Sequence, residues 1–164
     1  IHKYRPALCP NCWHGCLNLG SDRHIWWYCP MVQPFWRDVA AVLSRILGYP
    51  VPYEASVLLV GIRHNTLCCQ SKEDRRVMWS CLAVAKTTLA FYWRKALTPP
   101  ITLWWVRLWT LLAMEKLTDA TTGMGSDFED TWGHLVAYMS SEEQALLQPP
   151  CIRSLHLLRG GMNY

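Results

Sequence analysis

Apolar residues recur every three or four positions in four separate stretches of the chain, which is the spacing of an amphipathic helix. The helices predicted from these stretches cover residues 33–47, 72–96, 103–117 and 126–139. The first ends at Gly48, a typical C-terminal stop signal. The third is apolar on nearly every side, which predicts a buried helix at the centre of the fold. The pattern therefore indicates a mostly α-helical protein.

Capping signals support two of these helices, and three weaker patterns complete the picture. Ser71 stands three residues before Asp74, and Ser126 stands three residues before Glu129, as in the side-chain box that begins a helix. The weaker patterns predict a strand or buried connector over 55–62, a separate short helix from Ser140 or Ser141 to Leu147, and an amphipathic segment over 152–158.

Composition and charge narrow the class of protein. The chain has 164 residues, of which 51% are hydrophobic and 17% charged, so it is no disordered chain and has the length of about one domain. The net charge is +4, but residues 1–107 hold 13 basic and five acidic side chains, whereas residues 108–164 hold three and seven. A basic front two thirds favours a polyanionic partner.

We expect neither a secretory signal nor a membrane helix. Residues 1–6 lack the apolar segment of a signal peptide. The longest apolar stretch, 101–114, contains Arg107 and is shorter than the roughly 20 residues that span a bilayer. The chain begins with Ile rather than Met, which favours a piece of a longer polypeptide.

Half of the eight cysteines lie within a short N-terminal segment that also contains histidine. The ligands predicted from their spacing are Cys12, Cys16, His24 and Cys29. Three thiolates and one imidazole bind zinc tetrahedrally, and four protein ligands favour one closed structural site over a catalytic one. Cys9 can replace Cys16 in an alternative set, and His14 can also compete. A redox or disulfide cluster is the other interpretation, and the missing secretory signal argues against it.

These features predict two parts of the chain. Residues 1–30 form a small zinc knuckle, and residues 31–164 form a compact bundle of about four to six helices.

The ten tryptophans include a group on the predicted helices and a group near the cysteine segment. Those on apolar helix faces, expected in the core, are Trp93, Trp105, Trp109 and Trp132. Those that cluster with the cysteine segment, and are candidates for contact with a ligand, are Trp13, Trp26, Trp27 and Trp36.

The cysteine segment carries a resemblance to a known family. Residues 12–36 resemble the cysteine-rich C-terminal segment of the second open-reading-frame protein of vertebrate LINE-type non-LTR retrotransposons. The resemblance rests on the order of five short motifs: Cys-Trp-His-Gly-Cys, His, Trp-Trp, Cys and Val-Gln-Pro-x-Trp. Ala-Val-Ala-Lys-Thr at 83–87 with Trp93 resembles the helix that follows the motif in that family. Met114-Glu115 and Arg-Gly-Gly at 159–161 resemble its tail, whereas Cys9 departs from the mammalian form.

The resemblance implies a function that this segment performs for an enzyme. The family's parent protein is an endonuclease and reverse transcriptase that nicks target DNA and copies its own RNA from the exposed 3′ end. Neither the Tyr/Phe-x-Asp-Asp signature of the polymerase nor the endonuclease His/Asp/Glu set occurs in this sequence. The resemblance therefore implies a non-catalytic segment that binds element RNA or target DNA during target-primed reverse transcription. It also implies the upstream domains as partners, and a cytoplasmic ribonucleoprotein and the nucleus as locations.

Basic and aromatic residues interleave around the cysteine segment and recur on the helix predicted over 72–96. Arginine and lysine meet phosphates, and exposed aromatic rings accept unstacked bases. The predicted nucleic-acid-binding residues are Arg5, Arg23, Trp26, Trp27, Arg37, Arg75, Arg76, Arg94 and Lys95. The last four form either a second phosphate track or a solvated helix face. Trp26 and Trp27 can alternatively pack the cysteine segment against the helix over 33–47.

Two other functions remain open from the sequence. The main alternative is a zinc-stabilised interaction module that docks on the rest of the polyprotein or on a host factor. A less favoured one is an independent zinc enzyme or a secreted disulfide domain. Charge reversals would leave an interaction module unaffected, and metal analysis would expose a disulfide domain.

Overall fold

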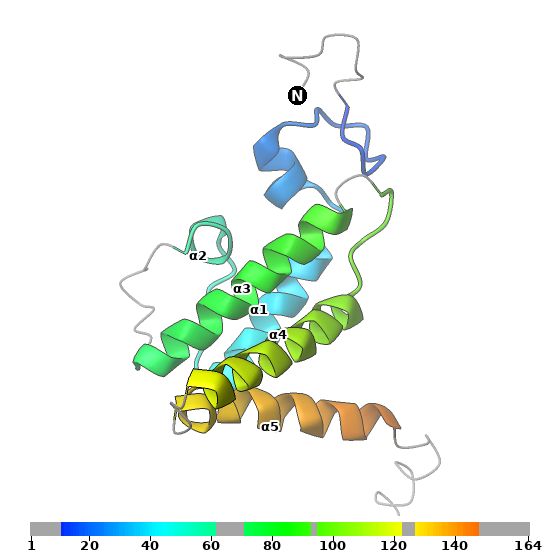
Figure 1. Cartoon of the computed structure of the whole chain (residues 1–164). Coiled ribbons are helices and arrows are strands. Elements are labelled where there is room, and N and C mark those ends of the chain that lie inside the picture. The colour runs from blue at the N-terminus through cyan, green and yellow to red at the C-terminus, as the bar shows by residue number, and fades with distance from the viewer. Residues whose placement is uncertain (1–10, 62–70, 93–94, 123–126, 148–164) are drawn as a thin grey trace, which may run out of the picture.

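The computed structural model of the chain describes residues 11–61, 71–92, 95–122 and 127–147 (Figure 1). Its elements are a π-helical turn η1 (His24–Tyr28) and the helices α1 (Gln33–Leu47), α2 (Ala55–Leu58), α3 (Lys72–Tyr92), α4 (Ile101–Thr122) and α5 (Asp127–Leu147). Within these ranges, the extended pairing is limited to an isolated bridge between Asn11 and Leu19. The prediction of a mostly α-helical fold is confirmed.

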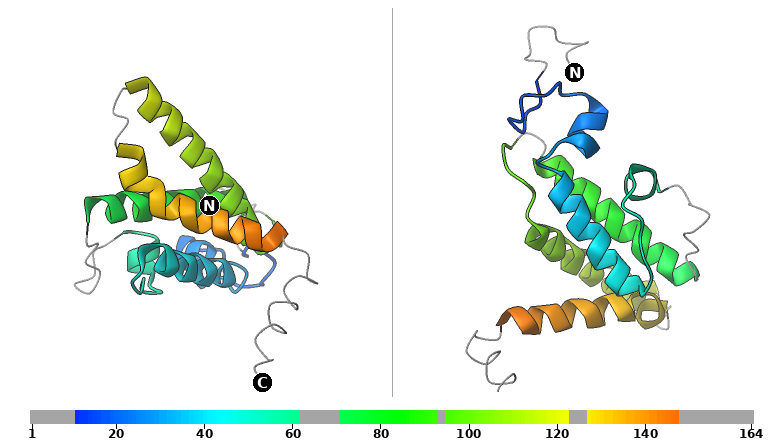
Figure 2. Two further views of the ribbon diagram at one scale, coloured as in Figure 1. Left: turned by 90° about the horizontal axis from the view of Figure 1, so that it is seen from below. Right: turned by 180° about the vertical axis from the view of Figure 1, so that it is seen from behind.

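The four long helices form one bundle, and each of them contacts the other three. In Figures 1 and 2, α1 and α3 lie side by side, α4 packs against α3 at an oblique angle, and α5 crosses near their lower ends. The cysteine-rich segment sits at the opposite end, beside the start of α1 and the end of α3. Its buried residues belong to the same hydrophobic core as those of the bundle. The cysteine-rich segment and the helical part are therefore packed together.

Two of the predicted helix boundaries have the expected local chemistry. Gly48 adopts a left-handed backbone with φ 75°, and its N–H donates to the Ser44 carbonyl at 3.1 Å. Glycine adopts this conformation without steric penalty, so α1 ends where the sequence predicts. The backbone N–H of Asp74 donates to Ser71 Oγ at 2.9 Å, which confirms the predicted cap of α3.

Of the weaker predictions, one is confirmed in one of its two alternatives and another is wrong. The apolar run at 55–62 begins as a short helix, α2, with Val57 and Leu58 buried, so it is a buried connector and no strand. Instead of a new helix from Ser140 or Ser141, α5 continues unbroken to Leu147. The Ser141 hydroxyl donates back to the Tyr138 carbonyl at 2.7 Å, and a serine bonded in this way stays inside a helix. Ser126 and residues 152–158 lie outside the described residues.

The most apolar long helix, α4, is not the central one. Its buried residues form a single stripe of Trp104, Leu108 and Leu112. Val106, Met114 and Leu117 on its other sides are each more than half exposed, because no described helix covers them. The fully buried large aromatic residues are Phe35, Trp36, Trp104 and Trp132, whereas Trp105 and Trp109 are only partly buried. No helix of the described ranges is long and apolar enough to cross a membrane.

Candidate metal centre

The first two cysteines lie on a tight turn that the backbone closes on itself. The N–H of Cys12 donates to the Asn18 carbonyl at 2.7 Å, and the N–H of Gly15 donates to the Cys12 carbonyl at 3.1 Å. Gly15 has φ 77°, and Leu17 has φ 64°. Two left-handed residues on either side of Cys16 reverse the chain and aim both thiols at the same point.

The other two ligands stand at the ends of the π-helical turn η1. The N–H of Cys29 donates to the His24 carbonyl at 2.8 Å, an i→i+5 bond. A π turn is wider than an α turn and brings residues five apart onto one side, and such turns are frequent at functional sites. Ile25 and Trp27 are buried beneath it. From the sequence, this segment is predicted only as a loop that holds the metal. The spacing of its apolar residues does not predict the π turn.

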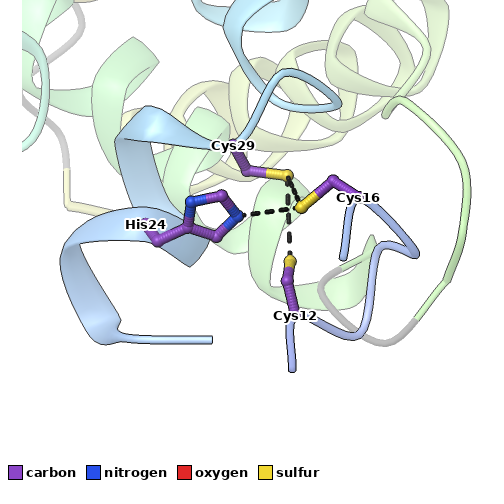
Figure 3. A group of neighbouring side chains, drawn as sticks. All are labelled: Cys12, Cys16, His24 and Cys29. Atoms are coloured by element: carbon purple, nitrogen blue, oxygen red, sulfur yellow. Dashed lines mark hydrogen bonds between the residues drawn. The ribbon is translucent and has the colours of Figure 1, made fainter. Parts of the chain in front are cut away.

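The four side chains converge on one point, as Figure 3 shows. The ligand atoms of Cys12, Cys16, His24 and Cys29 all lie within 4.8 Å of one another. The Cys29 Sγ atom lies 3.8 Å from Cys12 Sγ and 3.7 Å from Cys16 Sγ. His24 Nε2 lies 3.0 Å from Cys16 Sγ. Among the described residues, the structure therefore brings Cys16 into the cluster with Cys12, His24 and Cys29. The alternative ligand Cys9 lies outside the described residues.

These separations fit a four-coordinate metal ion. A tetrahedral ion with metal–sulfur bonds of 2.3 Å places its sulfur ligands about 3.8 Å apart. Both Sγ–Sγ separations that involve Cys29 agree with that edge length. The shorter distance between Cys16 and His24 is that of a hydrogen bond between a thiolate and a ring N–H. The residues can thus hold a tetrahedral metal ion with four protein ligands, which leaves no open coordination position for a substrate.

The three thiols differ in acidity. Burial raises the pKa of Cys29 to about 12, and burial also raises the pKa of Cys12. Desolvation acts in the same direction on Cys16, but hydrogen bonds from the Asn18 backbone and from His24 outweigh it and lower the pKa to about 6. Near neutral pH the metal-free site therefore contains one thiolate and two thiols.

This difference predicts how metal affinity depends on pH. Above about pH 6.5 a divalent ion must displace protons from Cys12 and Cys29, so the association constant should rise roughly a hundredfold per pH unit, about tenfold for each proton. Below about pH 6, Cys16 is also protonated and the dependence should steepen. Competition with a chromophoric zinc chelator at several pH values measures the slope. A constant affinity between about pH 6.5 and 8 would contradict the assignment of the two thiols as ligands.

His14 lies beside the four ligands without joining them. It is almost fully buried, and its Nδ1 atom lies 3.4 Å from Cys12 Sγ. Burial lowers the pKa of His14, and the charge of His24 lowers it further. A neutral imidazole that donates a hydrogen bond to a metal-bound thiolate orients that ligand. His14 therefore has the position of a supporting residue rather than of a competing ligand.

We call residues 12–29, which contain the four clustered side chains, the metal segment. The tryptophans in it and next to it are less exposed than their sequence positions predict. Trp36 is fully buried, and its Nε1 donates to the Trp26 carbonyl at 2.9 Å. Trp27 is also buried, with its ring centroid 6.2 Å from that of Trp36 and 5.0 Å from that of Tyr53. Trp26 is partly buried. The aromatic side chain that does reach the surface of η1 is Tyr28, which is 61% exposed.

The predicted basic residues differ in exposure and in their partners, and Arg37 donates a hydrogen bond to Gln33 Oε1 at 3.3 Å. Arg23 at the start of η1 and Arg37 in the first turns of α1 are exposed beside the metal segment. Arg76 instead forms an ion pair of 2.8 Å with Glu115 of α4 and lies 5.6 Å from the Trp132 ring centroid. It thereby joins α3, α4 and α5. Arg5 and Arg94 lie outside the described residues.

Arg75 and Arg76 lie far from Lys95, so the structure places these predicted residues in two separate groups. Arg75 and Arg76 lie in the first turns of α3, whereas Lys95 lies three residues after Tyr92, the last residue of α3. At about 1.5 Å per helical residue, Arg76 and Tyr92 are roughly 24 Å apart. Lys95 has different neighbours, Phe91 and Tyr92, over whose rings its Nζ lies at 4.2 and 4.5 Å. Sequence reasoning missed these aromatic partners.

A search against models of known protein families found no match for this chain. The class of protein is thus defined by its own fold and site. The described residues form a helical bundle with a Cys₃His cluster packed on one end, and this cluster can hold a metal ion.

Proposed function

We propose that this chain is the non-catalytic, nucleic-acid-binding C-terminal segment of a LINE-type reverse transcriptase, and that its metal is one structural zinc ion. The observation that carries the proposal is the convergence of Cys12, Cys16, His24 and Cys29. These are the residues of the motif on which the resemblance rests. Zinc is the ion that such a thiolate-rich tetrahedral set prefers in proteins.

In this function the ligands have a structural task. When bound, zinc supplies no chemistry beyond linking the turn around Cys16 to η1. Cys29 extends this linkage to the bundle, because its carbonyl accepts the N–H groups of Val32 and Gln33 at 3.0 and 3.2 Å, where α1 begins. The metal segment is thereby held at a defined place on the helical body.

The proposed nucleic-acid contact begins at the exposed cations beside this segment. Arg23 and Arg37 project from its edge, and Tyr28 provides an exposed aromatic ring between them in sequence. Arginine binds phosphate by releasing counterions, so affinity falls as salt rises. Element RNA and target DNA are the proposed ligands, and the upstream polymerase and endonuclease domains are the proposed neighbours.

Salt-dependent binding tests the proposal. The chain should bind single-stranded RNA or DNA with an affinity that falls steeply with salt, and Arg23→Gln and Arg37→Gln should each reduce the log–log slope by about 0.7 to 1. Lys116→Gln is the matched control, because Lys116 is an exposed cation of α4 in the acidic part of the chain. Electrophoretic shift titrations at several salt concentrations measure all three variants.

Two results would contradict the nucleic-acid function. Either the zinc-loaded chain binds no nucleic acid at low salt, or Arg23→Gln and Arg37→Gln bind as the unaltered chain does. The second candidate function, a protein-interaction module, is favoured by the outer face of α4, where Val106, Met114 and Leu117 are exposed. In that case polar substitutions on this face would abolish assembly with the upstream domains, and the arginine variants would have no effect.

A further inference from the structure

Phe91 lies at the centre of an exposed aromatic and cationic cluster where α3 meets α4. Its side chain is 55% exposed although it is large and apolar. Lys95 Nζ lies 4.2 Å from the Phe91 ring centroid, and the Arg107 guanidinium lies 5.3 Å from it. The Tyr92 ring packs at 5.7 Å from that of Phe91 and also contacts Lys95 Nζ at 4.5 Å. We call these four residues the Phe91 cluster.

The Phe91 cluster holds two positive charges without an anionic partner of its own. Among the described residues, neither Lys95 nor Arg107 forms an ion pair, and both side chains lie against aromatic rings. Two cations that share one ring repel each other, and an exposed cation–π contact compensates weakly. An anion that contacted both would relieve this repulsion.

The Phe91 cluster is continuous with the metal segment. The end of α3 lies next to that segment in Figures 1 and 2. A side chain at Gly15 would come within 3.8 Å of Ala96, the residue after Lys95. Leu97, the next residue, is 60% exposed. A flexible polymer that binds beside the metal segment can therefore reach the cluster.

We infer that the Phe91 cluster is a subsite for single-stranded nucleic acid, which deepens the proposed function and rests on it. Phe91 provides the stacking face for one unpaired base, and Lys95 and Arg107 turn from the ring to the flanking phosphates. A base–aromatic stack is stronger than an exposed cation–π contact, so the exchange is favourable. A duplex cannot use the ring, because its bases are already stacked and paired.

Fluorescence anisotropy with a labelled single strand of roughly 12 nucleotides tests the inference. Phe91→Leu keeps an apolar side chain and removes the ring, and it should weaken single-strand binding about tenfold without changing the salt slope. Lys95→Gln and Arg107→Gln should each lower the slope by about 0.7. Binding of the same strand as a duplex should not change in Phe91→Leu. Circular dichroism and zinc content show that each variant is folded.

Matched controls come from the other end of α3. Trp79 is exposed by 53%, and Lys72 is an exposed cation, so Trp79→Leu and Lys72→Gln change the same chemistry about 18 Å or more from Phe91. Both should bind as the unaltered chain does. Inorganic polyphosphate serves as a competitor that has charge without bases.

The outcomes separate this inference from the proposed function. If the unaltered chain binds the strand and Phe91→Leu binds equally well, the cluster assignment is overturned and the proposed function stands. The assignment is also overturned if Phe91→Leu and Trp79→Leu lose equal affinity for the single strand. The same holds if Phe91→Leu loses as much affinity for the duplex as for the single strand. If polyphosphate binding is as sensitive to Phe91→Leu as strand binding, the cluster is a simple anion site and holds no base. If the unaltered chain binds no strand, both proposals fail.

Discussion

Cys29→Ser is expected to abolish metal binding and to unfold the segment that precedes α1. Cys29 is fully buried, and its Sγ atom lies within 3.8 Å of two other ligands. A serine hydroxyl is a poor metal ligand, and the three remaining ligands would leave the fourth tetrahedral position without a strong protein ligand. Structural zinc contributes directly to the free energy of folding, so the loss of stability should exceed about 4 kcal/mol. Metal analysis and urea denaturation of the purified variant measure both effects.

Cys81 provides the matched control for that experiment. It is also fully buried, in α3, and burial raises the pKa of its thiol to about 12, but it is not among the four clustered ligands. Cys81→Ala should keep one metal ion per chain and lose about 1 kcal/mol of stability. Full metal content and an unchanged urea midpoint in Cys29→Ser would show that another residue, such as Cys9 or His14, completes the site.

Trp104→Ala should be the most destabilising substitution in the helical bundle. The Trp104 side chain is fully buried, and its Nε1 donates to the Cys81 carbonyl of α3 at 3.1 Å. Truncation leaves a large cavity between α3 and α4 and removes the donor from that carbonyl. Replacement of a buried tryptophan by alanine costs about 3 to 5 kcal/mol, a large part of the roughly 5 to 15 kcal/mol that stabilises a typical domain.

Trp79→Ala is the control that shows whether the loss of stability comes from the burial of Trp104 or only from the removal of an indole ring. Trp79 is 53% exposed on α3, so its truncation should cost less than about 1 kcal/mol. Thermal or urea unfolding, followed by far-ultraviolet circular dichroism, measures both variants. If the two substitutions destabilise the chain equally, the packing of α4 against α3 through Trp104 is wrong.

The sequence predicts best those features that depend on residues close together in the chain. Periodic apolar positions locate α1 and α3, and Gly48 and Ser71 act at the ends where their backbone and side-chain chemistry requires them. The clustered residues Cys12, Cys16, His24 and Cys29 are likewise predicted from side-chain chemistry and short spacing, although the spacing leaves Cys9 and His14 as alternatives. Each of these features is determined by local geometry.

Other features depend on which helix lies next to which, and these the sequence does not predict. The outer sides of α4 also carry large apolar residues, so composition cannot show that Val106 and Leu117 face outward. Arg76 has the sequence signature of a phosphate-binding residue, but its actual partner, Glu115, is 39 positions away. Phe91 and Arg107 come together only because α3 and α4 are in contact. The π turn at His24–Tyr28 buries Ile25 and Trp27 in the same hydrophobic core as the residues of the bundle.

The short connection between Cys29 and α1 has a consequence for binding entropy. A metal ligand and the first turn of a helix share one carbonyl, and the buried Val32 lies between them. No flexible linker separates the metal segment from the bundle, so their relative orientation is set before any partner arrives. A ligand that contacts both parts loses its own translational and rotational entropy on binding. No further entropy is lost in fixing the two parts relative to each other. Contacts of modest strength can then add up across the two parts, as they do in a preorganised receptor.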